Sequence, residues 1–129
     1  MTTCRNKPCE FCPYRRDVPS GIWDVTEYAK LPPYDLPTGE QPFGIFMCHV
    51  DPDQACTGWV DVGFKQPHDR DLLALRFNPI ETPDFEFPVE TFDTHTDAAV
   101  HGLRDIRSPK PAAQRAMVKL GRIVTARKK

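Results

Sequence analysis

The chain has 129 residues, a formal net charge of −1 and a hydrophobic fraction of 40%. These values suit one folded domain with a modest core and exclude a disordered chain. No run approaches the ~20 apolar residues of a membrane-spanning helix, and Met1 to Arg5 do not resemble a signal peptide. We therefore expect a cytoplasmic protein with no membrane segment.

The first half of the chain predicts little regular structure. Its prolines, part of a total of 14, remove backbone donors and favour loops, and residues 1–20 read as one loop. Residues 24–31 predict a short helix, capped by Asp24 or Thr26 and stopped by the following prolines. The apolar run 43–48 predicts a buried strand or extended segment, and residues 59–64 predict a strand or extended turn.

The second half predicts more helix. Residues 69–77 are rich in leucine and favour a helix, whereas residues 85–89 alternate and indicate an edge strand. Thr94 or Thr96 would cap a helix over residues 97–106. Ser108 followed by Pro109 predicts the start of a C-terminal helix that ends at Gly121 or shortly after it.

The cysteines carry the strongest chemical signal. Five is an odd number, which argues against a fully paired disulfide framework, and clustered cysteines in a reducing compartment favour metal binding. Cys9 and Cys12 form a C-x-x-C turn, and Cys48 and Cys56 follow in a second loop region. Four thiolates satisfy a tetrahedral zinc ion or the four irons of a cubane cluster. We predict that Cys9, Cys12, Cys48 and Cys56 are metal ligands.

Several alternatives stay open for this site. The cysteines would otherwise be ordinary buried thiols or a redox pair. Zn²⁺ is slightly favoured over a [4Fe-4S] cluster, although Pro13 after Cys12 is a feature of ferredoxin ligands. His49 is an alternative ligand, but its position beside Cys48 in an extended segment would turn it away from the metal. Cys4 reads as part of a frayed N-terminal end.

These elements predict a small α+β fold, mostly helical and loop-rich, stapled by the cysteine-ligated metal centre. The chain reads as a single domain over residues 1–129. Residues 1–64 would form its metal-binding half, and residues 69–129 a helical half that ends in a basic helix.

Charge is distributed unevenly along the chain. Residues 104–129 carry nine basic residues and one acid, while residues 1–103 are net acidic. The basic set proposed to contact nucleic acid is Arg115, Lys119, Arg122, Arg127, Lys128 and Lys129. Arg5, Lys7, Arg15 and Arg16 flank the first cysteine pair and would add to such a surface. A solvated helix packed on the body is the alternative interpretation, because no aromatic residues interleave with the basic ones.

The strings CEFCPYRRDVPSGIW, FMCH, CTGW, DLLALRF and DAAVHGLRDI resemble a family of short proteins from actinobacteria and their phages. That family is a domain of unknown function marked by C-x-x-C-P and a later Cys-His. The resemblance spans nearly the whole chain and implies no mechanism. It marks Cys9, Cys12, Cys48, His49 and Cys56 as the characteristic positions.

The function expected from the sequence is a small, non-enzymatic, metal-binding regulatory protein that contacts nucleic acid or a nucleic-acid-handling host protein. An iron–sulfur redox or sensor protein is the first alternative, and an enzyme with an open metal position is the second. No nucleophile–base pair or phosphate-binding loop is evident, and His68, His95 and His101 are scattered along the chain.

Overall fold

The computed structural model describes residues 3–80 and 90–127. Five α-helices lie in this part of the chain: α1 (Val25–Ala29), α2 (Thr57–Phe64), α3 (Leu73–Phe77), α4 (His95–Arg104) and α5 (Pro111–Arg127). Three short 3₁₀ helices are added, η1 (Pro32–Asp35), η2 (Thr38–Glu40) and η3 (His68–Arg70). The described residues contain isolated β-bridges but no sheet, so the predicted α+β class is wrong and the fold is helical.

Neither of the two possible strands that can be examined forms a regular strand, and the physical reasons differ. Residues 59–64 belong to α2, in which every residue from Thr57 to Gly63 is buried. A helix buried on all sides has no polar stripe, so its sequence shows no helical period. Residues 43–48 are largely irregular and contribute a single bridge residue, Met47, which pairs with Ala55. The predicted strand over residues 85–89 lies outside the described residues.

The predictions of helices α1 and α4 are confirmed, because their N-cap residues are recognisable in the sequence. Asp24 caps α1 by accepting a hydrogen bond from the Thr26 backbone, and Thr94 caps α4 by accepting one from Asp97. The segment 69–77 divides into η3 and α3. Helix α5 begins at Pro111 rather than Pro109 and continues through Gly121 to Arg127.

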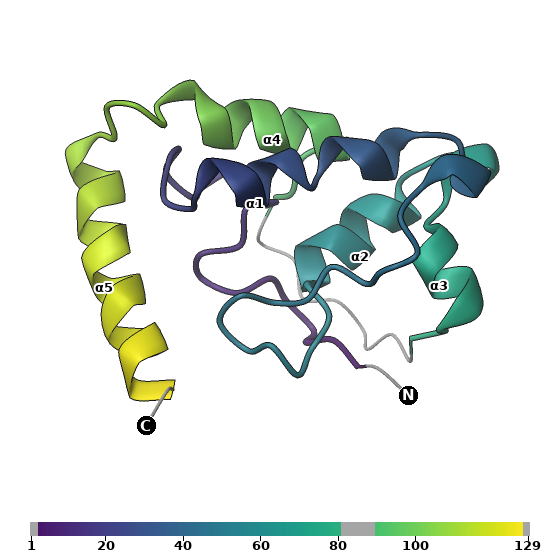
Figure 1. Cartoon of the computed structure of the whole chain (residues 1–129), viewed down its shortest axis with the longest axis horizontal. Coiled ribbons are helices and arrows are strands. Elements are labelled where there is room, and N and C mark those ends of the chain that lie inside the picture. Colours follow the sequence, from purple (N-terminus) through teal and green to yellow (C-terminus); the bar gives the residue numbers. More distant parts are fainter. Residues whose placement is uncertain (1–2, 81–89, 128–129) are drawn as a thin grey trace.

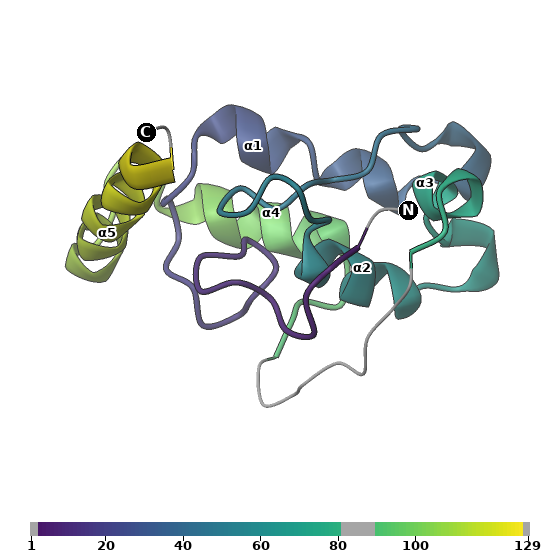
Figure 2. The same ribbon diagram turned by 90° about the horizontal axis from the view of Figure 1, so that it is seen from below.

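Figures 1 and 2 show how the helices are arranged. Helix α4 packs along α1 and η1, and α2 lies beneath them in the interior. The main core forms around α2, and its fully buried side chains include Tyr14, Leu31, Trp59, Val60 and Val62. No helix in the described part of the chain is long and apolar enough to span a bilayer.

Helix α5 stands at one end of the molecule in both views. It packs through Ala113 and Leu120 on Phe11, Val18 and Ile22 of the N-terminal loop, and we call this group the α5 cluster. This cluster is separate from the main core, so α5 is attached to the body through a small apolar contact.

Candidate metal centre

The first cysteine pair lies in a loop that is fixed by hydrogen bonds. The Cys12 backbone N–H donates to the Cys9 carbonyl at 3.1 Å, which closes a turn between the two residues. The Arg15 guanidinium donates to the same carbonyl at 3.4 Å, and the Trp23 indole donates to the Phe11 carbonyl at 2.9 Å. These contacts hold the C-x-x-C turn in place against the body.

The second pair is positioned by a short antiparallel contact between two segments. The Cys48 backbone N–H donates to the Gln54 carbonyl at 2.8 Å, and the Cys56 N–H donates to the Phe46 carbonyl at 2.8 Å. Cys56 is also the N-cap residue of α2. The pairing therefore brings Cys48 to the start of the buried helix.

These elements bring the four predicted cysteines together from distant parts of the chain. The sulfur atoms of Cys12 and Cys56 lie 3.6 Å apart in the interior. Cys9 and Cys48 form a second hydrogen-bonded pair, and Cys9 lies close enough to Cys12 and Cys56 to interact electrostatically with both. All five cysteines of the chain are free thiols, and of the clustered four only Cys9 is partly exposed.

Gly58 makes the approach of α2 to the first pair sterically feasible. A Cβ atom at this position would lie 2.6 Å from the Cys12 sulfur and 2.6 Å from the Tyr14 Cβ. Any larger residue would push the helix start away from the cysteine loop. The absence of a side chain at Gly58 therefore allows the start of α2 to lie against Cys12 and Tyr14.

The surroundings shift the pKa values of Cys9, Cys48 and Cys56. The hydrogen bond from Cys9 lowers the pKa of Cys48 to about 6, and it raises the pKa of Cys9 in turn. The Asp51 backbone N–H also donates to the Cys48 sulfur at 3.4 Å. Burial raises the pKa of Cys56 well above its usual value, and the neighbouring Cys12 adds to that effect. Each pair thus shares protons that a metal ion would displace.

The sulfur geometry can be compared with that of a bound ion. Zinc–thiolate bonds of about 2.3 Å place the corners of a tetrahedron roughly 3.8 Å apart, close to the 3.6 Å between Cys12 and Cys56. Among the described residues, no group of three or more cysteine, histidine or acidic side chains is arranged so that it could bind a metal ion without rearrangement. Binding of one ion by all four thiolates would replace the hydrogen bonds within the two pairs.

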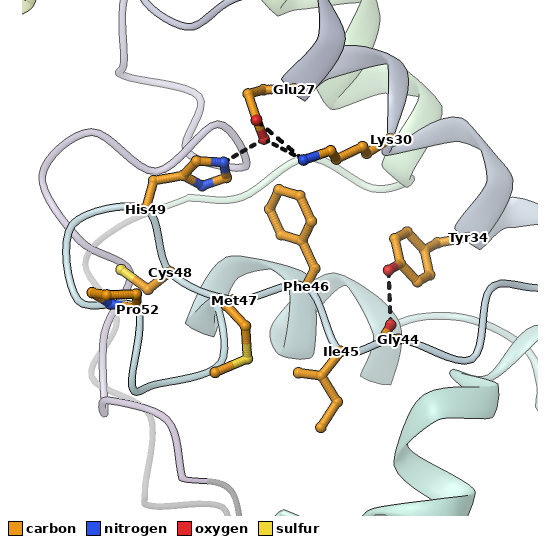
Figure 3. Close-up of a pocket in the computed structure, with 10 residues that line it drawn as sticks. All are labelled: Glu27, Lys30, Tyr34, Gly44, Ile45, Phe46, Met47, Cys48, His49 and Pro52. Carbon is orange, nitrogen blue, oxygen red and sulfur yellow. Dashed lines mark hydrogen bonds and ion pairs between the residues drawn. The ribbon is translucent and has the colours of Figure 1, made fainter.

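His49 lies beside this cluster and faces helix α1. Its Nε2 lies 2.5 Å from the Glu27 carboxylate, and its ring packs on Trp23 with centroids 4.6 Å apart. Figure 3 shows the imidazole extending toward the Glu27 carboxylate on α1. In this position His49 anchors the loop that carries Cys48.

Cys4 does not lie in a frayed end, contrary to the sequence-based expectation. It is buried in the main core and pairs with Ala55 through a parallel bridge. The Ala55 backbone N–H donates to the Thr3 carbonyl at 2.8 Å, which ties the N-terminal segment to the body. Burial raises the pKa of the Cys4 thiol.

A buried Tyr14–His95 pair next to the cysteines has no counterpart among the predicted site residues. The Tyr14 hydroxyl and His95 Nδ1 are 2.7 Å apart, and both side chains are inaccessible to solvent. Burial lowers the pKa of His95 to about 4, so its ring is neutral at physiological pH. The ring accepts a hydrogen bond from the Tyr14 hydroxyl at Nδ1. His95 Nε2 has no hydrogen-bond partner among the described residues. The only sequence signal was the position of His95 directly after the helix cap Thr94.

The predicted basic surface is partly described. Arg115, Lys119 and Arg122 are all exposed on α5, and Lys119 Nζ lies 2.5 Å from the Glu10 carboxylate. Neither Arg115 nor Arg122 forms an ion pair with a residue that the structure describes. Arg127 ends α5, its side chain is not described, and Lys128 and Lys129 lie outside the described residues.

The basic residues that flank the cysteine loop are mostly paired with acids. Arg5 lies 3.8 Å from Asp51, Arg15 forms a bidentate pair with Asp17, and Arg16 lies 3.5 Å from Asp93. Together with Lys7, Arg5 and Arg15 line a surface pocket of about 530 Å³ beside Cys9. Their positive charge lies where it would offset a group of thiolates.

Residues 4–120 match a family of unknown function, DUF6283. The chain belongs to this family. Comparisons with curated proteins and with solved structures found no match. Family membership covers both the cysteine cluster and most of α5, and it brings no activity with it.

Proposed function

We propose that this member of the family is a metal-binding protein whose Cys9, Cys12, Cys48 and Cys56 hold one Zn²⁺ ion in a closed, structural site. The observation that carries the proposal is the convergence of these four thiols, with Cys12 and Cys56 at 3.6 Å. Four protein thiolates leave no open position for a substrate or water, which favours a structural role over catalysis.

A [4Fe-4S] cluster is the alternative occupant. A cubane separates its thiolate ligands more widely than a single ion does, because each sulfur binds a different iron. The short distance between Cys12 and Cys56 therefore favours zinc. The neutral buried surroundings of Tyr14 and His95 would suit either centre.

Elemental analysis of protein purified with and without oxygen tests the metal. We expect a colourless protein with one zinc per chain in both preparations. A brown protein with stoichiometric iron and sulfide from the anaerobic preparation would replace zinc with the cluster. Cys4→Ser is the matched control, because Cys4 is buried but lies in neither cysteine pair.

The wider role that we propose is regulatory, in a reducing cytoplasm and in an actinobacterial or phage setting. Its partner would be nucleic acid or a nucleic-acid-handling host protein. The exposure of Arg115 and Arg122 on the outer side of α5 supports a phosphate contact, because neither is neutralised by a described acid.

Duplex DNA binding measured across a salt series tests the phosphate contact. We expect weak binding at low salt that declines steeply as salt rises, with a slope reduced by about two in Arg115→Ala/Arg122→Ala. Arg104→Ala, at an exposed cation on α4, is the control and should leave the slope unchanged. No binding at low salt would remove nucleic acid from the proposal and leave the metal site untouched.

A further inference from the structure

Three short segments lie side by side next to the cysteines. Ala55 pairs with Cys4 on one side through a parallel bridge and with Met47 on the other through an antiparallel bridge. The hydrogen bonds around Met47 come from its neighbours, since Phe46 accepts from Cys56 and Cys48 donates to Gln54. The segment around Met47 is therefore the outer one of three short segments joined by isolated bridges.

The outer side of this segment carries unpaired main-chain groups. In an antiparallel pair, successive residues direct their N–H and C=O groups to opposite sides. Because Phe46 and Cys48 face residues 54–56, the main-chain groups of Ile45 and Met47 face outward. Neither residue forms a main-chain hydrogen bond with any residue that the structure describes.

This outer edge borders a pocket of about 470 Å³ between the segment 44–49 and helix α1. Figure 3 shows Phe46 pointing into the space below Lys30, while Ile45 and Met47 point the opposite way. The alternation is that of an extended chain. At the α1 side, Glu27 joins His49 at 2.5 Å and Lys30 at 3.1 Å, so charged groups lie at the rim of an otherwise apolar pocket.

We infer that this pocket binds an extended segment of a partner protein, which adds as a further strand along Ile45 and Met47. An extended peptide is the ligand whose own alternating N–H and C=O groups complement such an edge. The volume of the pocket suits about three or four residues and lies within the range of known ligand sites.

The surroundings also set which side chains the peptide would carry. A residue on the same side of the new strand as Phe46 would meet that ring and Tyr34, so an apolar or aromatic side chain fits there. Lys30 is exposed, and because surface ion pairs such as the one with Glu27 contribute little, its ammonium group can also meet an acidic residue at the rim. The inference goes beyond the zinc proposal and does not depend on it.

Selection from a library of short random peptides, displayed on phage, tests the inference. We expect extended peptides with an apolar residue next to an acidic one, and their binding should shift the backbone amide NMR signals of Ile45 and Met47. N-methylation of alternate peptide residues removes donors from one edge only. It should weaken binding about tenfold in one register and leave it unchanged in the other.

Met47→Pro is the protein-side variant, because proline removes the outward N–H while the inward bonds of Phe46 and Cys48 remain. Met47→Leu keeps the N–H and is the matched control. The inference is overturned if the library yields no binder, if selected peptides bind both variants equally, or if N-methylation has no effect in either register. Concentration-dependent dimers that Met47→Pro abolishes would assign the edge to a second copy and also overturn it.

Discussion

The cysteine-bearing body and helix α5 are built in different ways. In the body, loops with little regular structure are held by buried thiols, main-chain hydrogen bonds and the core around Trp59 and Val60. Helix α5 is a long regular element, and its described contacts with the body are centred on the α5 cluster and on the pair formed by Lys119 and Glu10. The longest helix of the described chain is therefore the one that is least tightly attached to the body.

The difference teaches where stability and binding are expected to reside. Removal of a thiol should affect the whole body, because three chain segments meet at the cysteines. Changes in α5 should stay local, since its own hydrogen bonds do not depend on the body. The predictions that follow use this contrast, beginning with the largest effect.

Cys56→Ser should cause the largest loss. It removes one of the four proposed zinc ligands at the start of α2, and we expect zinc to be lost and the free energy of unfolding to fall by several kcal/mol, on the order of 5. Zinc content and urea unfolding measure both effects. Cys4→Ser should keep zinc; equal zinc loss in the two variants would argue against the assignment of Cys56 as a ligand.

Acid should weaken the body through His95. Its pKa is about 4 in the folded protein against 6.5 as a free side chain, so the unfolded chain binds the proton first as pH falls. The contribution of neutral His95 to the free energy of unfolding is fully present above pH 6.5 and is lost by pH 4, a change of about 3 kcal/mol.

Urea unfolding across this pH range checks the effect. His95→Gln should flatten the dependence, whereas His68→Gln, at a nearly fully exposed residue, should not. Parallel curves for wild type and His95→Gln would show that His95 does not contribute.

Leu120→Ala should detach α5 without disturbing the cysteines. Leu120 is buried in the α5 cluster, and its truncation should cost about 2–3 kcal/mol of local stability. Hydrogen exchange should accelerate in α5 while zinc content stays unchanged. Zinc loss in this variant would mean that α5 and the cysteine cluster form one cooperative unit.

Two glycine substitutions, one in the body and one in α5, should change the stability of the protein in opposite directions. Gly58→Ala would place a methyl group 2.6 Å from the Cys12 sulfur, so it should weaken zinc binding and destabilise the body by about 1–2 kcal/mol. Gly121→Ala meets nothing within 4 Å in α5 and should stabilise that helix by up to about 1 kcal/mol. Thermal unfolding and zinc affinity are measured for both variants. If both were destabilised to a similar extent, the proposed difference between the body and α5 would be contradicted.

Local signals in the sequence predicted part of this fold. Asp24 and Thr94 correctly predict the starts of α1 and α4, because an N-cap side chain bonds only to backbone groups a few residues away. Helix α2 was mistaken for a strand because it is buried on all sides and its sequence has no period. The pairing of Ala55 with both Cys4 and Met47 joins distant segments, and no local pattern encodes it.

The candidate site likewise contains residues that local sequence patterns indicate and residues that depend on tertiary packing. The C-x-x-C spacing pointed to Cys9 and Cys12 directly, and the sulfur chemistry suggested Cys48 and Cys56 as their companions. His95 could not be linked to Tyr14 from sequence, since 81 positions separate them and the contact depends on the packing of α4. The anchoring of His49 by Glu27 likewise depends on where α1 lies.

X-ray absorption at the zinc edge of the purified protein tests the central claim most directly. The account predicts a single shell of four sulfur atoms at about 2.3 Å from the metal. A shell containing nitrogen or oxygen, or a protein that carries no zinc and takes none up, would contradict it.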